Sequence, residues 1–180
     1  MLFKSVTEFA RDAAFTTAIF GFFASVWFGW AQEKPPASWR TWLIVGSGLS
    51  LAMVVAGGLL AWRHWSDGTV FDASTGKAFG IVVGIEFGLA GIGAAILGAS
   101  KRSELIPVWI ALVVGLHLFP VAVILDYPFI HVIGALVTLA ALAAVPVARA
   151  RSLPVSLTNG VGAGMALLVG AITSLVVALG

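Results

Sequence analysis

Two ionisable side chains stand inside long apolar stretches of the sequence, where a charge is costly. Glu86 lies in a run over 78–99 that holds no other ionisable residue. A charged side chain in the middle of a membrane-spanning helix costs roughly 2.5–3.5 kcal/mol on insertion scales. Glu86 therefore needs a partner, a proton or a water-filled cavity. The next apolar run supplies a candidate partner, His117.

The positions of Glu86 and His117 place them at the same depth. Their two runs are joined by a short connection and must be antiparallel. Glu86 follows the start of its run at Ala78 by eight residues, and His117 precedes the end of its run at Leu125 by eight. At 1.5 Å per residue, both lie about 12 Å below the same surface. We expect both side chains to face the bundle interior and to approach within hydrogen-bond distance.

A buried carboxyl–imidazole pair has two interpretations. In a low dielectric, the Glu⁻/HisH⁺ and GluH/His⁰ forms can be close in energy, which suits a proton relay or a site for a cation or small polar solute. The alternative is a neutral hydrogen bond that only holds two helices together, worth roughly 0.6–2 kcal/mol. Because ionisable groups inside membranes mark functional sites by default, we favour a substrate or proton site at Glu86 and His117.

Four further residues are candidates for a supporting role. Pro120 cannot donate a hydrogen bond to the carbonyl of Leu116, so we expect a kink and a free carbonyl beside His117. Asp126, Tyr127 and His131 gather where the fourth run turns into the fifth, and together with Trp62, His64, Trp65, Asp67, Phe71 and Asp72 they could rim a vestibule above the pair. For Tyr127 and the tryptophans we favour the alternative, an aromatic belt at the lipid headgroups.

Metal and enzyme chemistry have weaker support. Glu86, His117, Asp126 and His131 are of types that bind Zn or Fe. However, no such pair inside a run has helical ligand spacing, and the two histidines lie at different depths. The sequence leaves metal and cofactor open. Its serines lack the context of a hydrolase motif, so we lean against an enzyme.

The composition identifies the solvent as lipid. Of 180 residues, 60% are hydrophobic and 10% charged, whereas a soluble domain carries about 25% charged residues. The net charge is only +2 and the chain has no basic cluster, which argues against nucleic-acid binding.

Six apolar runs are long enough to cross a bilayer. They predict one all-α domain over 1–180, a bundle of six transmembrane helices with short connections. An amphipathic segment over 2–13 predicts an interfacial helix before the first run, and its acidic residues argue against a cleaved signal peptide. The runs span 13–31, 41–62, 78–99, 105–125, 129–148 and 156–179.

Charge and glycine patterns bear on orientation and assembly. The side that holds both termini carries four Lys and Arg residues and the opposite side six, so we expect both termini outside the cytoplasm. Gly80, Gly84 and Gly88 form a stripe that lets another helix approach closely. Packing within the chain is the interpretation we favour for this stripe, and a homo-oligomer interface is the alternative.

The segment over 104–120, ELIPVWIALVVGLHLFP, resembles a stretch of small bacterial integral membrane proteins in which an ELIPxW opening precedes a GxHF.P pattern. Leu118 departs from the usual Phe. The resemblance covers under a fifth of the chain and implies a bacterial family centred on His117 and Pro120, but no activity. We expect the protein in the bacterial inner membrane.

Together these observations favour a small transporter or channel subunit whose Glu86 and His117 bind a proton, cation or small polar solute. The alternative is a membrane protein that does not transport, either an assembly partner of a larger complex or a binder of lipid or cofactor.

Overall fold

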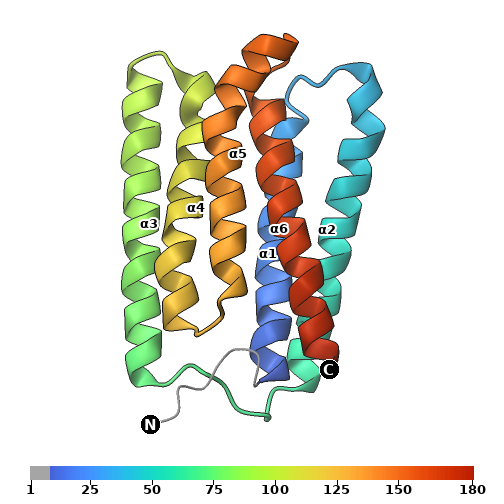
Figure 1. The fold of residues 1–180 in the computed structure, drawn as a ribbon, viewed down its shortest axis with the longest axis vertical. Coiled ribbons are helices and arrows are strands. Elements are labelled where there is room, and N and C mark those ends of the chain that lie inside the picture. Colours follow the sequence, from blue (N-terminus) through green and yellow to red (C-terminus); the bar gives the residue numbers. More distant parts are fainter. Residues whose placement is uncertain (1–8) are drawn as a thin grey trace.

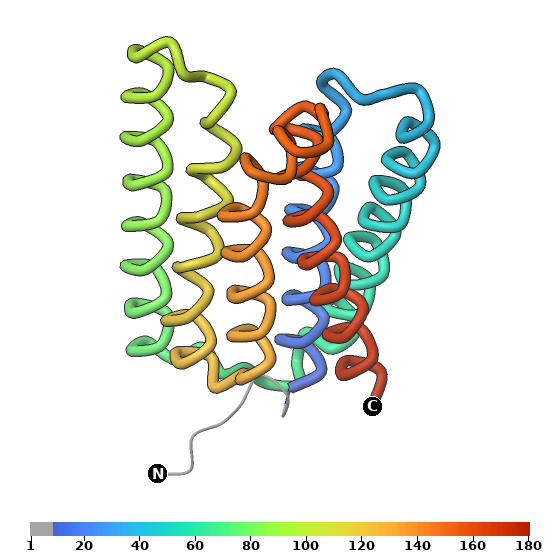
Figure 2. The backbone as a smooth tube through the Cα atoms, turned by 45° about the horizontal axis from the view of Figure 1, so that its top comes forward, coloured from blue at the N-terminus to red at the C-terminus, as the bar shows by residue number. Residues whose placement is uncertain are grey.

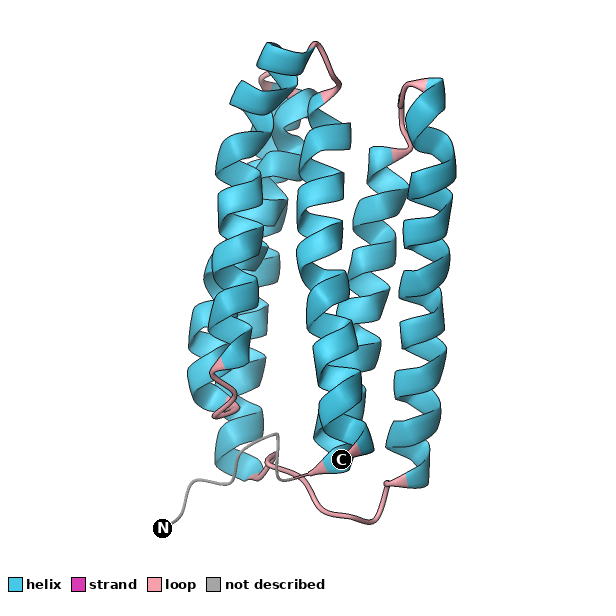
Figure 3. Cartoon of the chain, turned by 45° about the vertical axis from the view of Figure 1, so that its right-hand side comes forward, coloured by secondary structure: helices cyan, strands magenta, loops and turns pink. Residues whose placement is uncertain are grey.

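The structure is a computed structural model, and it describes residues 9–180. Six long helices follow one another with short connections, and the described residues contain no strand (Figures 1 and 3). Each helix is long and apolar enough to cross a membrane, as in an integral membrane protein. The predicted all-α bundle of six spans is confirmed. The helices are α1 (Ala10–Ala31), α2 (Ala37–Arg63), α3 (Ala73–Ala99), α4 (Ile106–Ile124), preceded by a single 3-10 turn (Ser103–Leu105), α5 (Phe129–Arg151) and α6 (Val155–Leu179).

Several helices begin earlier than their apolar runs. Helix α3 begins five residues before Ala78, because the Asp72 side chain accepts hydrogen bonds from the backbone N–H groups of Ser74 and Thr75. The hydrogen bond from the Thr75 N–H, with those from Ser74, lowers the pKa of Asp72 to about 2. The predicted interfacial helix over 2–13 falls largely outside the described residues, and its last residues belong to the first turn of α1.

The bundle is built around α1, which packs between α2 and α6 (Figures 1 and 2). Helices α4 and α5 join α3 to this group in the order α3, α4, α5, α6. Close approach depends on glycine: a Cβ at Gly57 of α2 would lie 2.6 Å from the carbonyl oxygen of Ala14 and from the amide nitrogen of Ala18 in α1. Helix α1 contacts α6 as extensively as it contacts α2, so the first and last spans are also neighbours.

One end of the bundle gathers the start of α1, the α2–α3 connection, the α4–α5 turn and Gly180 (Figure 1). We call it the terminal end. An even number of spans returns the chain to the side on which it began, which is why both ends of the described chain meet there.

The glycine stripe does not pack against any other part of residues 9–180. At Gly80, Gly84 and Gly88 an added Cβ would meet no atom within 4 Å, and α3 has no buried residue. Helix α3 packs mainly against α4, where the Trp109 indole donates to the Leu89 carbonyl at 2.9 Å and its ring lies against Gly93. The interpretation of the stripe as an intramolecular contact is wrong, since small residues at this spacing permit close approach without specifying the partner.

Candidate functional site

Glu86 and His117 meet between α3 and α4. Glu86 lies at the midpoint of α3, and its Oε2 is 3.3 Å from Nε2 of His117. The two side chains are 13% and 16% exposed, so both are largely removed from the surface but remain accessible. The predicted approach of these two groups within hydrogen-bond distance is present. Their role as a substrate or proton site stays a prediction.

The second ring nitrogen of His117 determines how many protons the pair holds. Nδ1 lies 2.8 Å from the carbonyl oxygen of Val114. A carbonyl only accepts, so Nδ1 carries a hydrogen and donates it. Nε2 faces Oε2 of Glu86 at the ion-pair distance of 3.3 Å, and it carries a hydrogen when Glu86 is a carboxylate or a lone pair when Glu86 is protonated. Each of these two forms holds one proton on one or the other group, and without that proton a lone pair would face a carboxylate.

A cavity of about 290 Å³ borders the pair. Side chains of α1, α3 and α4 supply most of its wall, with single residues from α5, α6 and the α2–α3 connection. Three titratable side chains line it, namely Asp12, Glu86 and His117, and most of the other lining residues are apolar. Six of these are phenylalanines: Phe15, Phe20, Phe23, Phe71, Phe79 and Phe87.

The cavity opens between α1 and α3. These two helices make at most slight contact, and the lining residues at their facing edges, Phe15, Ile19 and Phe23 on α1 and Phe87 on α3, are exposed. In a bundle that crosses a bilayer, exposed apolar side chains at this depth face lipid. The cavity therefore communicates with the hydrocarbon rather than only with water at one end.

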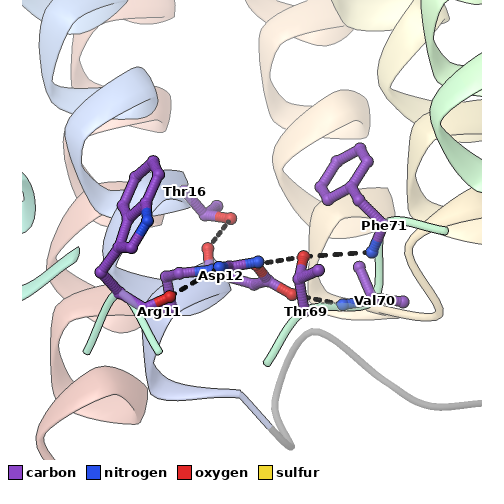
Figure 4. A network of polar contacts seen from close by, with 7 residues as sticks. Arg11, Asp12, Thr16, Thr69, Val70 and Phe71 are labelled. Atoms are coloured by element: carbon purple, nitrogen blue, oxygen red, sulfur yellow. Dashed lines mark hydrogen bonds and ion pairs between the residues drawn. The ribbon is translucent and has the colours of Figure 1, made fainter. Parts of the chain in front are cut away.

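Asp12 closes the cavity wall toward the terminal end and is buried, with 4% of its surface exposed. It accepts hydrogen bonds from the Thr69 hydroxyl at 2.9 Å and the Val70 N–H at 2.6 Å (Figure 4). Nε of Arg11 lies 3.7 Å from the same carboxylate, and the Arg11 guanidinium also donates to the Trp65 carbonyl. These contacts fasten the α2–α3 connection to α1 and compensate the charge of Asp12.

The same connection places Phe71 in the cavity wall. The amide N–H of Phe71 donates to the Thr69 hydroxyl at 3.1 Å, and its ring packs edge-on against Phe79 of α3.

The sequence interpretation missed Asp12 as a site residue, because it placed this residue on the polar face of an interfacial helix. Its partners lie 57 and 58 positions away, so no local pattern signals the contact.

None of the four supporting candidates lines the cavity. Pro120 is an exposed residue inside α4. Asp126 is exposed at a positive φ of 46° in the α4–α5 turn. Nδ1 of His131 lies 3.3 Å from the Pro128 carbonyl oxygen. The supporting role of these residues stays a prediction. We expected the Leu116 carbonyl beside His117, but the carbonyl that contacts the His117 ring is that of Val114.

Tyr127 is not part of an aromatic belt. Its side chain is 3% exposed, and its hydroxyl lies 3.4 Å from the Ser174 hydroxyl in α6. The belt interpretation is wrong for this residue, because the turn after α4 directs the ring between the helices. Trp62 and Trp65, by contrast, are exposed near the terminal end, as a belt requires.

Among residues 9–180, no three His, Asp or Glu side chains gather where they could hold a metal ion. Comparisons of the chain with protein-family models, with curated proteins and with solved structures found no match. The resemblance of the segment over 104–120 to small bacterial membrane proteins stays a prediction.

Proposed function

We propose that this protein is a small transporter or channel subunit of the bacterial inner membrane, in which Glu86 and His117 bind a proton or a cation. The observation that supports it is the pair itself: a carboxyl group and an imidazole 3.3 Å apart, at the midpoint of a membrane-spanning helix, in the wall of a cavity. A pair that shares one proton, and that is reached from a cavity, can exchange this proton for another cation.

The test is flux into liposomes measured over a series of pH values. Glu86→Gln keeps the shape of the side chain and removes its ionisation, so it should abolish proton- or cation-coupled flux while leaving the fold intact. Glu86→Leu should also abolish flux without unfolding the protein, since it removes the cost of burying a carboxyl group. Glu104→Gln is the matched control, because Glu104 is exposed outside the cavity. Full flux in Glu86→Gln would contradict the proposal.

A membrane protein that binds a ligand without transporting it is the second candidate. The mainly apolar lining of the cavity and its opening toward lipid favour this function. The two candidates differ in liposomes: a binder would retain a lipid-soluble ligand through purification but show no Glu86-dependent flux.

We further propose that both termini face the exterior of the cytoplasmic membrane, on the basis of the Lys and Arg distribution. The chain has no cysteine, so a single cysteine introduced after Leu179 can be labelled cleanly. An impermeant thiol reagent should label it in intact spheroplasts. Labelling only after lysis would reverse the orientation.

The glycine stripe supports a proposal about assembly. Gly80, Gly84 and Gly88 are open at the surface of α3, where a second copy of the chain could pack closely. Gly84→Leu should weaken a dimer measured by single-molecule photobleaching in bilayers, whereas Gly48→Leu, at another open glycine on α2, should not. A monomer in the unmodified protein would contradict this proposal.

A further inference from the structure

The wall of the cavity combines aromatic rings with one carboxyl group that lacks a fixed cationic partner. Its six phenylalanines provide apolar surface and ring faces that attract cations. Among the described residues that line it, there is no lysine or arginine. Asp12 is already compensated by Arg11 and by its hydrogen bonds from the α2–α3 connection. Within residues 9–180, Glu86 is paired only with His117, whose charge depends on its protonation.

We propose that the cavity between α1 and α3 binds a lipophilic organic cation, which enters from the membrane and takes the place of the proton shared by Glu86 and His117. This inference rests on the proposed function and specifies its substrate class. The apolar body of the ligand lies against the phenylalanines, and its cationic group lies beside the Glu86 carboxylate.

Charge balance couples the cation to the proton. Before binding, the pair with its single proton has no net charge. After binding, Glu86 is a carboxylate, His117 is neutral and still donates its Nδ1–H to the Val114 carbonyl, and the cation supplies the positive charge. The proton passes to water, so the site again has no net charge. An apolar cavity strongly disfavours an uncompensated charge, which makes the exchange one proton for each cation.

The groups that face the pair support this balance. Helix α4 contributes His117, and α1 contributes Asp12 on the cavity wall with Arg11 behind it. The lining residues of α5 and α6, Ile130 and Leu167, carry no charge. No second cation on the wall therefore competes with the ligand for Glu86 within the described residues.

The size and opening of the cavity set the kind of ligand. A volume of about 290 Å³ lies just below the roughly 300–1,000 Å³ of small-molecule pockets. A compact aromatic cation suits it better than a phospholipid with two long chains. The exposed edges at Ile19 and Phe87 provide a path from the hydrocarbon, so a ligand soluble in lipid need not cross the headgroups of the terminal end to reach Glu86.

The probe is 1-methyl-4-phenylpyridinium, a permanent aromatic cation, and its matched control is 4-methylbiphenyl, which has the same shape without the charge. Binding to the full-length protein in nanodiscs is measured by calorimetry in buffers of different ionisation enthalpy. We expect the cation to release one proton and to bind up to tenfold more tightly for each unit rise in pH while the pair is protonated. The neutral control should release no proton.

Variants of Glu86 test where the cation binds. Glu86→Gln should weaken the cation at least tenfold and abolish proton release, while 4-methylbiphenyl binds as before, which also reports that the cavity has kept its shape. Glu104→Gln should change the affinity for neither ligand. Equal affinity of cation and neutral control, or a cation affinity unaffected by Glu86→Gln, would overturn the inference.

Lateral entry is tested with single cysteines, since the chain has none of its own. A bulky maleimide on Ile19→Cys should slow cation binding severalfold, whereas the same label on Leu49→Cys of α2, which is exposed away from the cavity, should not. Unchanged rates with both labels would overturn entry between α1 and α3.

These outcomes separate the inference from the proposed function. Binding with proton release but no flux in liposomes would refute transport and leave the cation site intact. Flux that depends on Glu86, without binding of the aromatic cation, would refute the substrate class and leave transport intact.

Discussion

Adjacent glycines on α2 provide a measurement of how closely the membrane helices pack. At Gly57 an added Cβ would lie 2.6 Å from two backbone atoms of α1, the Ala14 carbonyl oxygen and the Ala18 nitrogen, whereas at Gly58 it would meet nothing within 4 Å. Because backbone atoms cannot rotate away, Gly57→Ala must push α1 and α2 apart by several tenths of an ångström. Such overpacking costs about 1–3 kcal/mol.

The comparison with Gly58→Ala isolates this steric cost. Both substitutions gain the helix propensity of alanine over glycine, roughly 1 kcal/mol, and this gain cancels in their difference. We therefore expect Gly58→Ala to be more stable than Gly57→Ala by about 1–3 kcal/mol. The free energy of unfolding is measured by SDS titration in mixed micelles, followed by circular dichroism. Equal stability of the two variants would refute the close approach of α1 and α2.

Substitutions at Asp12, Asp72 and Gly93 test three separate contacts. Asp12→Asn should lower the free energy of unfolding by about 1.5–3 kcal/mol, since the amide has one acceptor oxygen for the two donors, the Thr69 hydroxyl and the Val70 N–H, and no charge for Arg11; an unchanged SDS midpoint would contradict the role of Asp12 in holding the α2–α3 connection to α1. The pKa of Asp72 is lowered from 3.8 to about 2, so its stabilisation is complete above pH 3.8 and is lost as the pH falls through about 2. Asp72→Ala should therefore be less stable than the unmodified chain at pH 7 but approach it near pH 2, while Asp72→Asn keeps the cap at both; a carboxyl titration midpoint at or above 3.8 would count against this. Gly93→Ala should displace the Trp109 ring and increase hydrogen exchange across α3, and Gly91→Ala, where the space is open, should not; equal exchange would disprove the ring contact.

The number and type of helices follow from the sequence because hydrocarbon requires the backbone to satisfy its own hydrogen bonds. Apolar runs of sufficient length therefore become helices regardless of their neighbours. The contact of Glu86 with His117 was also predictable, because antiparallel neighbours at a fixed rise per residue bring known positions to known depths. The ends of the helices were less predictable, because α3 begins where the Asp72 side chain caps it rather than where the apolar run begins.

The cavity itself was not predictable, because it depends on helices distant in sequence. Its wall combines Asp12 and the phenylalanines of α1 with residues of α3 and α4 that are far away in the sequence. Tyr127 shows the same limit, since its position in the turn fits a surface belt equally well, and only contact with Ser174 of α6 accounts for its burial. The glycine stripe likewise indicates which face of α3 another helix could approach closely, but it does not indicate which helix does so.

The pairing of the first span with the last has a consequence for biosynthesis. The face of α1 that packs against α6, which includes Trp27 and Phe28 beside Gly160 and Gly164, remains without its final partner while about 120 intervening residues are made. At ~5–20 residues per second this takes roughly 6–25 s. During that interval α1 packs mainly against α2, and lipid or an insertion factor covers its other side. The position of α1 in the cavity wall is therefore fixed only when the carboxyl-terminal helix enters the membrane. Formation of the cavity thus depends on α6, although among the described residues α6 contributes only Leu167 to its lining.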